Sequence, residues 1–298
     1  MAQQGSYTAA AARLGVSKAA VSQRIAELER TAGVPLVQRT TRSVRLTEAG
    51  QRLVDETRAS FDHIAQSFSR VRDLAGRPSG LLRVTAPVAF ARQQLVPRLG
   101  EFLRTYPEVR LELNLSDHLS SLATEGFDLA IRHTASPPDT HVAWLLCHTR
   151  SVLVASKAYL RRHGSPETPV ELAAHNCLHY PRSQETPAWT LAPRRKSAGS
   201  DRVTVQVSGS LAANNSEALR DAALSGVGIA LLPDFTAQAN LASGKLALVL
   251  PQWQPVGSFA ENLYALRPYS AHVPRAVSLF VAFLRQALSN GFAVDEPA

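Results

Sequence analysis

The sequence has few cysteines and no long hydrophobic run. Cys147 and Cys177 are the only two cysteines in 298 residues. Two cysteines are too few for a disulfide framework, so we expect a reducing, cytosolic setting. No stretch of about 18 uncharged apolar residues is present, so the sequence predicts no membrane-spanning helix and no membrane partner. Residues 1–15 lack the charged and apolar regions of a secretory signal.

Charged residues are also sparse, at 19%, and they are unbalanced in sign. Lys and Arg number 32 against 24 Asp and Glu, which gives a net charge of +8. Residues 1–60 hold nine of the bases and five of the acids, so a fifth of the chain carries half of that excess. The excess is compatible with nucleic acid, an acidic membrane surface or an anionic ligand, and it makes the N-terminal segment the candidate polyanion-facing part. The length indicates about two domains.

Motifs for catalysis are missing as well. The chain has no nucleophile elbow, no phosphate-binding P-loop, no zinc-protease motif and no complete dinucleotide-binding motif. His175, Cys177 and His179 alternate, so a strand would place them on one face and superficially resemble a zinc cluster. No fourth ligand is near them, and a structural zinc site needs four. We therefore expect no metal, no cofactor and no enzyme, although an enzyme on an α/β scaffold stays a third alternative.

Residues 6–30 have the pattern of two short helices joined by a tight turn. Ser6 and Ser17 are suited to cap the two helices, and Gly15 is suited to end the first in the left-handed conformation. Val21, Ile25 and Leu28 are spaced as one buried stripe on the second helix. This arrangement is typical of a helix-turn-helix.

The opposite face of the second helix carries mostly small residues, namely Ala19, Ser22, Gln23, Ala26 and Arg30. A helix in the major groove needs small neighbours so that its polar groups reach the base edges. The segment Leu36 to Leu46 predicts a hairpin whose arginines, Arg45 among them, would grip the flanking phosphates. A generic basic pair of helices is the alternative. The predicted DNA-binding residues are Thr8, Ser17, Lys18, Ala19, Ser22, Gln23, Arg24, Arg39, Thr41 and Arg42.

A long helix is predicted to start after Thr47. Its apolar residues repeat every seven positions in two series, which favours a short dimerising coiled coil over a helix packed on its own domain. Glycine and proline at residues 76, 78 and 80 then indicate a linker. The two series are Val54, Phe61, Phe68 and Ala75, and Thr57, Ile64 and Val71.

From Leu81 onward, short apolar runs alternate with helical patterns, which predicts an α/β fold with a mostly parallel sheet. The predicted strands are Leu81–Thr85, Val109–Leu115, Leu129–Arg132, Ser151–Ala155, Val203–Val207, Gly228–Leu232 and Leu263–Leu266. The predicted helices are Arg92–Thr105, Ser216–Leu224 and Val273–Leu288.

Three segments follow predicted strands or open predicted helices, where open α/β sheets bind ligands. Helix N-termini and an arginine there favour a carboxylate or another anion. The alternative for Arg132 is a structural ion pair, and the apolar Ala89 weakens the case for an anion. The predicted effector-binding residues are Pro87, Val88, Ala89, Phe90, Arg132, His133, Asn214 and Asn215.

Several motifs, in order along the chain, resemble the LysR-type transcriptional regulators. The N-terminal ones are Gly5-Ser6-Tyr7-Thr8-Ala9-Ala10-Ala11, Leu14-Gly15-Val16-Ser17, Ala20-Val21-Ser22, Arg39-Thr40-Thr41-Arg42 and Leu46-Thr47-Glu48-Ala49-Gly50. The later ones are Leu82-Arg83-Val84-Thr85, Glu125-Gly126-Phe127-Asp128-Leu129-Ala130-Ile131-Arg132 and Gly226-Val227-Gly228-Ile229-Ala230-Leu231-Leu232-Pro233.

The resemblance implies a sequence-specific regulator that binds double-stranded DNA as a homodimer or homotetramer. It implies a winged helix-turn-helix head at 1–47, a linker and dimerisation helix at 48–78, and an effector-binding domain at 81–298. That domain is expected to be periplasmic-binding-protein-like, with lobe I at about 81–157 and 262–298 and lobe II at about 158–261. A small molecule would bind between the lobes.

Two departures from the family pattern bear on the head. The family has one more helix before the Gly-Ser-Tyr segment, and only Met1 to Gln4 precede it here. We therefore expect a head that is incomplete at its N-terminus, either because the true start lies upstream or because this form binds DNA poorly. A solute-binding sensor with a non-functional truncated head is the alternative function. Lys18 and Ala19 also differ from the residues common in the family, so the half-site is not carried over.

Overall fold

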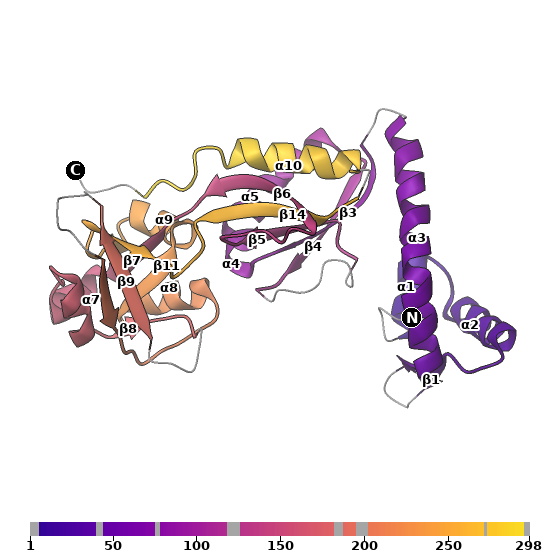
Figure 1. Ribbon diagram of the computed structural model, residues 1–298, viewed down its shortest axis with the longest axis horizontal. Helices are drawn as coiled ribbons and strands as arrows, with labels where there is room; N and C mark the ends of the chain where they lie inside the picture. The colour runs from indigo at the N-terminus through magenta and orange to yellow at the C-terminus, as the bar shows by residue number, and fades with distance from the viewer. Residues whose placement is uncertain are drawn as a thin grey trace. The chain divides into compact units, whose positions relative to one another are not determined.

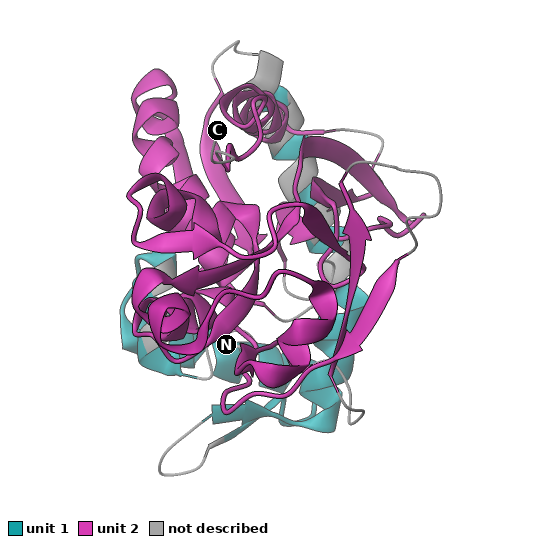
Figure 2. Ribbon diagram, turned by 90° about the vertical axis from the view of Figure 1, so that its left-hand side faces the viewer, with its two compact units in different colours: residues 1–71 teal, residues 72–298 magenta. Residues whose placement is uncertain are grey.

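The computed structural model describes residues 6–39, 44–74, 78–117, 126–181, 187–194, 202–270 and 273–294. The chain forms two compact units, residues 1–71 and residues 72–298, coloured separately in Figure 2. Within the described ranges, no helix combines the length and apolar character that crossing a membrane requires.

The first unit begins with two helices, α1 (Tyr7–Leu14) and α2 (Lys18–Ala32). The Ser17 side chain accepts a hydrogen bond from the Ala20 backbone N–H at 3.1 Å, which confirms it as the cap of α2. Gly15 ends α1 with φ of 65°, in the left-handed region that glycine adopts without strain. Ser6 occupies the N-cap position of α1, but its side chain makes no capping hydrogen bond.

The buried stripe on α2 is shorter than the sequence predicted. Val21 is buried in a cluster with Tyr7, Ala10 and Ala11, and Ile25 is partly buried against that cluster, but Leu28 is 45% exposed. Among the described residues, the α2 members of the hydrophobic cluster of the head are Val21 and Ile25, and Leu28 is not part of it. The prediction that Leu28 belongs to a buried stripe was therefore wrong.

The predicted hairpin is present as the antiparallel strands β1 (Val37–Arg39) and β2 (Val44–Leu46). It is tied to α2 because a carboxylate oxygen of Glu29 accepts the backbone N–H groups of Leu36 and Val37. The Thr47 hydroxyl accepts the Gly50 N–H at 3.0 Å and so caps α3 (Glu48–Leu74), the long helix of Figure 1.

The second unit contains a five-stranded sheet in the order β4-β3-β5-β14-β6, which we call lobe I together with its helices. α10 lies over this sheet in Figure 1, and Phe280 of α10 meets Phe102 of α5 with their ring centroids 4.9 Å apart. The strands of lobe I are β3 (Gly80–Ala86), β4 (Val109–Leu115), β5 (Leu129–His133), β6 (His141–His148) and β14 (Asn262–Pro268). Its helices are α4 (Val88–Phe90), the π-helical turn η1 (Ala91–Leu95), α5 (Val96–Thr105) and α10 (Arg275–Ala287).

Lobe II holds a four-stranded sheet in the order β12-β7-β11-β8 and a three-stranded sheet in the order β10-β9-β13. Two hydrophobic clusters fill it. The strands are β7 (Ser151–Ser156), β8 (Cys177–Leu178), β9 (Ala188–Pro193), β10 (Val203–Gln206), β11 (Ile229–Pro233), β12 (Leu246–Leu248) and β13 (Trp253–Val256). The helices are α7 (Lys157–His163), the 3-10 helix η2 (Pro169–Ala174), α8 (Ser216–Leu224) and α9 (Asp234–Ala242).

Two expectations about this unit are corrected. The sheets are mixed rather than mostly parallel. β14 runs antiparallel to its neighbours β5 and β6, and β7 runs antiparallel to its neighbours β11 and β12. Lobe I was expected to extend to about residue 157, whereas Ser151–Ser156 pairs within the lobe II sheet. The first crossing between the lobes therefore lies between β6 and β7.

That crossing is held by reciprocal hydrogen bonds. The Arg150 N–H donates to the Asp234 carboxylate at 2.9 Å, and the Asp234 N–H donates to the Arg150 carbonyl oxygen at 2.9 Å. The Arg150 guanidinium donates to the carbonyl oxygen of Val294, near the end of the chain. Burial raises the pKa of the Asp234 carboxyl to about 7, even though it accepts two backbone N–H groups.

Candidate functional site

The first turns of α2 present an exposed polar face. Ser17, Lys18, Ala19 and Gln23 are exposed, and Ser22 is half-buried between them. Arg24 of α2 and Thr8 of α1 are exposed as well. Because the N-terminal turn of a recognition helix is the part that contacts base edges, this face has the composition and the accessibility that reading DNA requires.

The hairpin beside α2 contributes basic side chains. Arg45 of β2 is exposed and pairs in register with Gln38 of β1. Arg39 ends β1, but its side chain lies outside the described residues, as do Thr41 and Arg42 entirely. Their predicted phosphate contacts stay predictions.

The head also has a pocket of about 630 Å³ that the sequence did not predict. It contains one acid, Glu48, and one base, Arg52, so its charges balance and favour neither sign of ligand. Its lining combines the turn after α2, β1 and the start of α3. The lining residues are Val34, Pro35, Gln38, Thr47, Glu48, Ala49 and Arg52.

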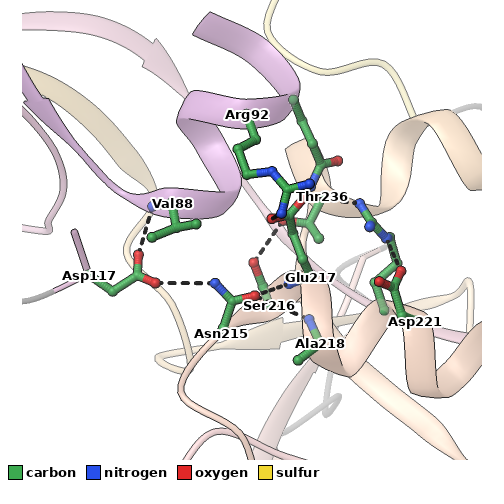
Figure 3. Close-up of polar contacts among 11 residues, drawn as sticks. Val88, Arg92, Asp117, Asn215, Ser216, Glu217, Ala218, Asp221 and Thr236 are labelled. Carbon is green, nitrogen blue, oxygen red and sulfur yellow. Dashed lines mark hydrogen bonds and ion pairs between the residues drawn. The ribbon is translucent and has the colours of Figure 1, made fainter. Parts of the chain in front are cut away.

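In the second unit, the two lobes meet at Asp117, which follows β4. Its carboxylate accepts the Val88 backbone N–H of lobe I at 3.0 Å and the Asn215 side-chain N–H of lobe II at 3.3 Å (Figure 3). The Asn215 side-chain oxygen caps α8 by accepting the N–H groups of Glu217 and Ala218. Val88 and Asn215, both predicted to bind the effector, are thus bridged by an aspartate that the sequence analysis missed. Its position two residues after the end of β4 is the signal that could have identified it.

The remaining residues of the segment 87–90 divide into two groups. Ala89 and Phe90 are buried, and the Phe90 ring meets the Phe235 ring edge to face with centroids 5.7 Å apart. These two side chains therefore belong to the packed interior, while Pro87 is half-buried and Asn214 is exposed.

Arg132 is buried, and its described contacts lie within lobe I. Its guanidinium donates to the Ile131 carbonyl oxygen at 3.0 Å and to the Thr85 hydroxyl at 3.3 Å. Both contacts are structural hydrogen bonds, and the predicted effector contact of Arg132 stays a prediction.

His133 lies in a row of aromatic rings that joins the lobes. Its ring stacks on Phe259 with centroids 6.3 Å apart and meets Phe235 edge to face. Phe259 in turn contacts Tyr180. The His133 Nε2 is 2.7 Å from the Thr149 hydroxyl, at the first crossing between the lobes. His133 is therefore a junction residue with both an apolar and a polar contact.

The alternating residues His175, Cys177 and His179 each have a separate partner. His175 Nδ1 is 3.2 Å from the Tyr159 hydroxyl, the Cys177 thiol donates to the Leu172 carbonyl oxygen, and His179 Nδ1 is 3.2 Å from the Cys177 carbonyl oxygen. Burial raises the pKa of the Cys177 thiol to about 12, which opposes the thiolate that a metal needs. Across the residues that the structure describes, no three His, Cys, Asp or Glu side chains are grouped as metal ligands would be.

Comparison with protein families identifies both units. The family of bacterial regulatory helix-turn-helix proteins of the lysR family matches residues 1–51. The LysR substrate binding domain matches residues 75–289.

The first match corrects one expectation. The matched residues 1–51 include both helices, both hairpin strands and the start of α3. The helix-turn-helix head is therefore present, and the alternative of a sensor with a truncated, non-functional head was wrong on this point.

Individual proteins give the same result. PtxR, a transcriptional regulator of Pseudomonas aeruginosa, is 35% identical over 292 residues, covering 97% of this chain and 90% of that protein. LtrA of Klebsiella pneumoniae, a probable transcriptional regulator, is 34% identical over 286 residues, covering 96% and 91%.

Two solved structures are similar over nearly the whole chain. CrgA of Neisseria meningitidis, a LysR-type transcriptional regulator, matches with a TM-score of 0.62 and 28% identity over 97% of this chain and 95% of that one. Full-length AphB, a virulence activator of Vibrio cholerae, matches with a TM-score of 0.61 and 26% identity over 94% and 93%. This chain belongs to the family of LysR-type transcriptional regulators.

Proposed function

We propose that α2 is the recognition helix of this regulator and that Lys18, Ser22 and Gln23 contact base edges in the major groove. The observation that carries this proposal is the exposed, small and polar face at the start of α2. The Ser17 side chain and the first backbone N–H groups would meet a phosphate at the groove edge, which fixes the register of the helix. Arg39 and Arg42 would hold flanking phosphates.

Footprinting upstream of the gene of this protein, with and without candidate metabolites, tests the proposal. Wild-type protein should protect a promoter segment, and Lys18→Ala should change which sequences are bound most tightly. The matched control is Lys157→Ala, an exposed lysine of α7 in the second unit, which should leave sequence preference unchanged. Absence of protection under every condition would contradict the proposal.

For the effector, we propose a site at the junction of the lobes, next to Val88, Asp117 and Asn215. Among the described residues, a single hydrogen bond, from Asn215 to Asp117, joins the lobes at this position, and a ligand can readily replace it with a contact of its own. The carboxylate already at this position weighs against the predicted anionic effector, unless the effector displaces it. We propose the same domain limits as the sequence indicates, 1–47 for the head, 48–78 for the linker helix and 81–298 for the effector-binding domain. The first crossing between the lobes is placed at residues 149–150.

The long helix α3 is proposed as the dimerisation element. Phe61 and Phe68 are 67% and 66% exposed, and Ile64 and Val71 are exposed on the same side. Exposed apolar residues at this spacing are stabilised when a second helix covers them. The relatives are transcriptional regulators. We therefore propose that this chain likewise acts in the cytoplasm by binding DNA, and not as an enzyme.

A further inference from the structure

Three consecutive side chains reach from lobe I to lobe II out of one π-helical turn, η1. Arg92 Nη1 lies 3.1 Å from the Glu217 carboxylate, and the Gln93 amide donates to the other Glu217 oxygen at 3.3 Å. The Gln94 amide donates to the Phe235 carbonyl oxygen at 2.9 Å. Turns of π-helix are rare in proteins, and those that occur are frequently found at functional sites. This turn serves to join the lobes.

Glu217 receives most of these contacts and is the least exposed member of the group. Its side chain is 9% exposed, whereas that of Arg92 is 64% exposed. Arg220 also approaches Glu217, at 3.7 Å, and pairs with Asp221 at 2.8 Å. A buried carboxylate that loses a partner is costly, because little water is available to replace it. Glu217 therefore favours arrangements in which η1 stays in place.

A second bridge starts from the same turn of α8. Asn215 contacts Asp117, and the Asp117 carboxylate also holds the Val88 N–H. In Figure 3, Asp117 and Arg92 approach the start of α8 from the lobe I side, with Asn215 and Glu217 facing them. Both bridges therefore end on one helical turn of lobe II.

We propose that these contacts form an interlobe latch, made of Arg92, Gln93, Asp117, Asn215 and Glu217, which sets the arrangement of the lobes when no effector is bound. Glu217 is its main positioning residue. The role in regulation rests on the proposed effector site, since a ligand shifts a two-state equilibrium only if it binds one state better. An effector at the lobe junction would bind one arrangement of the lobes better than the other by making or breaking latch contacts.

The test measures the distance between the lobes directly. Spin labels are placed on cysteines introduced at Asp139 of lobe I and Arg161 of lobe II, both exposed. The native thiols of Cys147 and Cys177 are buried, and burial raises the pKa of each to about 12, so they react slowly with the label. Full-length labelled protein is mixed with excess unlabelled protein, so that pairs within one chain dominate. Neither effector nor DNA is added.

The informative variants are Glu217→Gln and Arg92→Gln. Glu217→Gln keeps the side-chain size and removes the charge, and Arg220 retains Asp221 as its partner. The matched control is Glu112→Gln, which removes the carboxylate of the Arg83–Glu112 pair, 3.3 Å apart and wholly within lobe I. We expect the distance distribution to shift or broaden in both informative variants and to match wild type in the control. The double variant should move little further than Glu217→Gln alone.

Distributions of Glu217→Gln and Arg92→Gln that superimpose on wild type would overturn the latch. If Glu217→Gln fails to fold, Arg92→Gln decides, because Arg92 is mostly exposed and its loss leaves Glu217 with Arg220. Since no effector is present, failure of the proposed effector site would leave these distances unaffected. Failure of the latch would likewise leave effector binding to be measured on its own.

Discussion

Asp234 shows how one buried carboxyl group adds a pH dependence to stability. Its pKa is raised by burial from an ordinary value of 3.8 to about 7, with the Arg150 charge acting in the opposite direction. Between those two values the folded protein holds a proton that the unfolded chain has released. The free energy of unfolding therefore falls as the pH rises through this window, and the loss is complete above about pH 7.

In wild type, the free energy of unfolding should fall with a slope on the order of 1 kcal/mol per pH unit across this window. We expect Asp234→Asn to flatten this slope. Urea unfolding of both proteins at several pH values across the window measures it. The asparagine also loses one acceptor oxygen, but this lowers its stability by the same amount at each pH and so leaves its slope unaffected. Asp139→Asn removes an exposed carboxyl and should retain the wild-type slope. An unchanged slope in Asp234→Asn would show that another group titrates.

Single residues were also where sequence analysis was weakest. Arg132 and Phe90 were predicted beside the effector. The structure shows that Arg132 donates hydrogen bonds within lobe I and that Phe90 is fully buried, and their effector contacts stay predictions. Asp117 was missed although it bridges the lobes. Position after a strand indicates the correct edge of a sheet, but it does not determine whether a side chain points to the interior or to the junction.

At the scale of elements, regular patterns were the reliable signal. Val109–Leu115 and Ser216–Leu224 have the predicted bounds. The alternation of apolar residues defines the first, and the Asn215 cap defines the start of the second. β6, α7 and α9 were missed. α7 has 7 residues, too few turns to show a clear apolar period, and α9 buries the polar residues Asp234 and Thr236, so no apolar stripe marks its buried face.

The helix α3 gives a prediction about association. Phe68→Glu places a charge in the exposed apolar stripe, so a dimer that buries this stripe should dissociate at protein concentrations where wild type is dimeric. Analytical ultracentrifugation measures the change. Gln51→Glu adds the same charge on the same helix but about 120° around from the stripe, at about 100° per residue. That control should associate as wild type does, and equal association of all three proteins would exclude the stripe as the interface.

The junction of hairpin and linker helix depends on Gly50. A β-carbon at this position would overlap the carbonyl oxygen of Leu36, which also accepts the Thr47 N–H. Gly50→Ala should therefore destabilise the head by about 1–3 kcal/mol, seen as faster hydrogen exchange of the amides near Thr47.

The control for Gly50→Ala is Gly100→Ala in α5. There the nearest atom to an added β-carbon is the end of the flexible Arg104 side chain, at 3.3 Å. Alanine should stabilise that helix by roughly 0.5–1 kcal/mol and leave exchange near Thr47 unchanged. Wild-type exchange in Gly50→Ala would contradict the close packing at this junction.

At the scale of the whole molecule, the net charge of +8 favours association with the negatively charged backbone of DNA. Arg42→Ala should weaken binding to all DNA sequences alike and reduce the slope of log affinity against log salt by about one unit, because one phosphate contact is lost. Gel shifts at several salt concentrations measure it. Lys245→Ala changes the net charge equally from an exposed position in the second unit and should leave the slope unchanged. A loss confined to one operator sequence would instead assign Arg42 to base reading.

The sequence by itself determined the helix-turn-helix, the long amphipathic helix and the α/β character of the rest. These features follow from local rules, since caps, apolar periods and clustered charge are written in neighbouring residues. Only the tertiary structure decided which lobe each strand joins, that the sheets are mixed, and that Asp117 and Glu217 meet partners far along the chain. Such contacts depend on how distant segments cross, and no local pattern specifies that crossing.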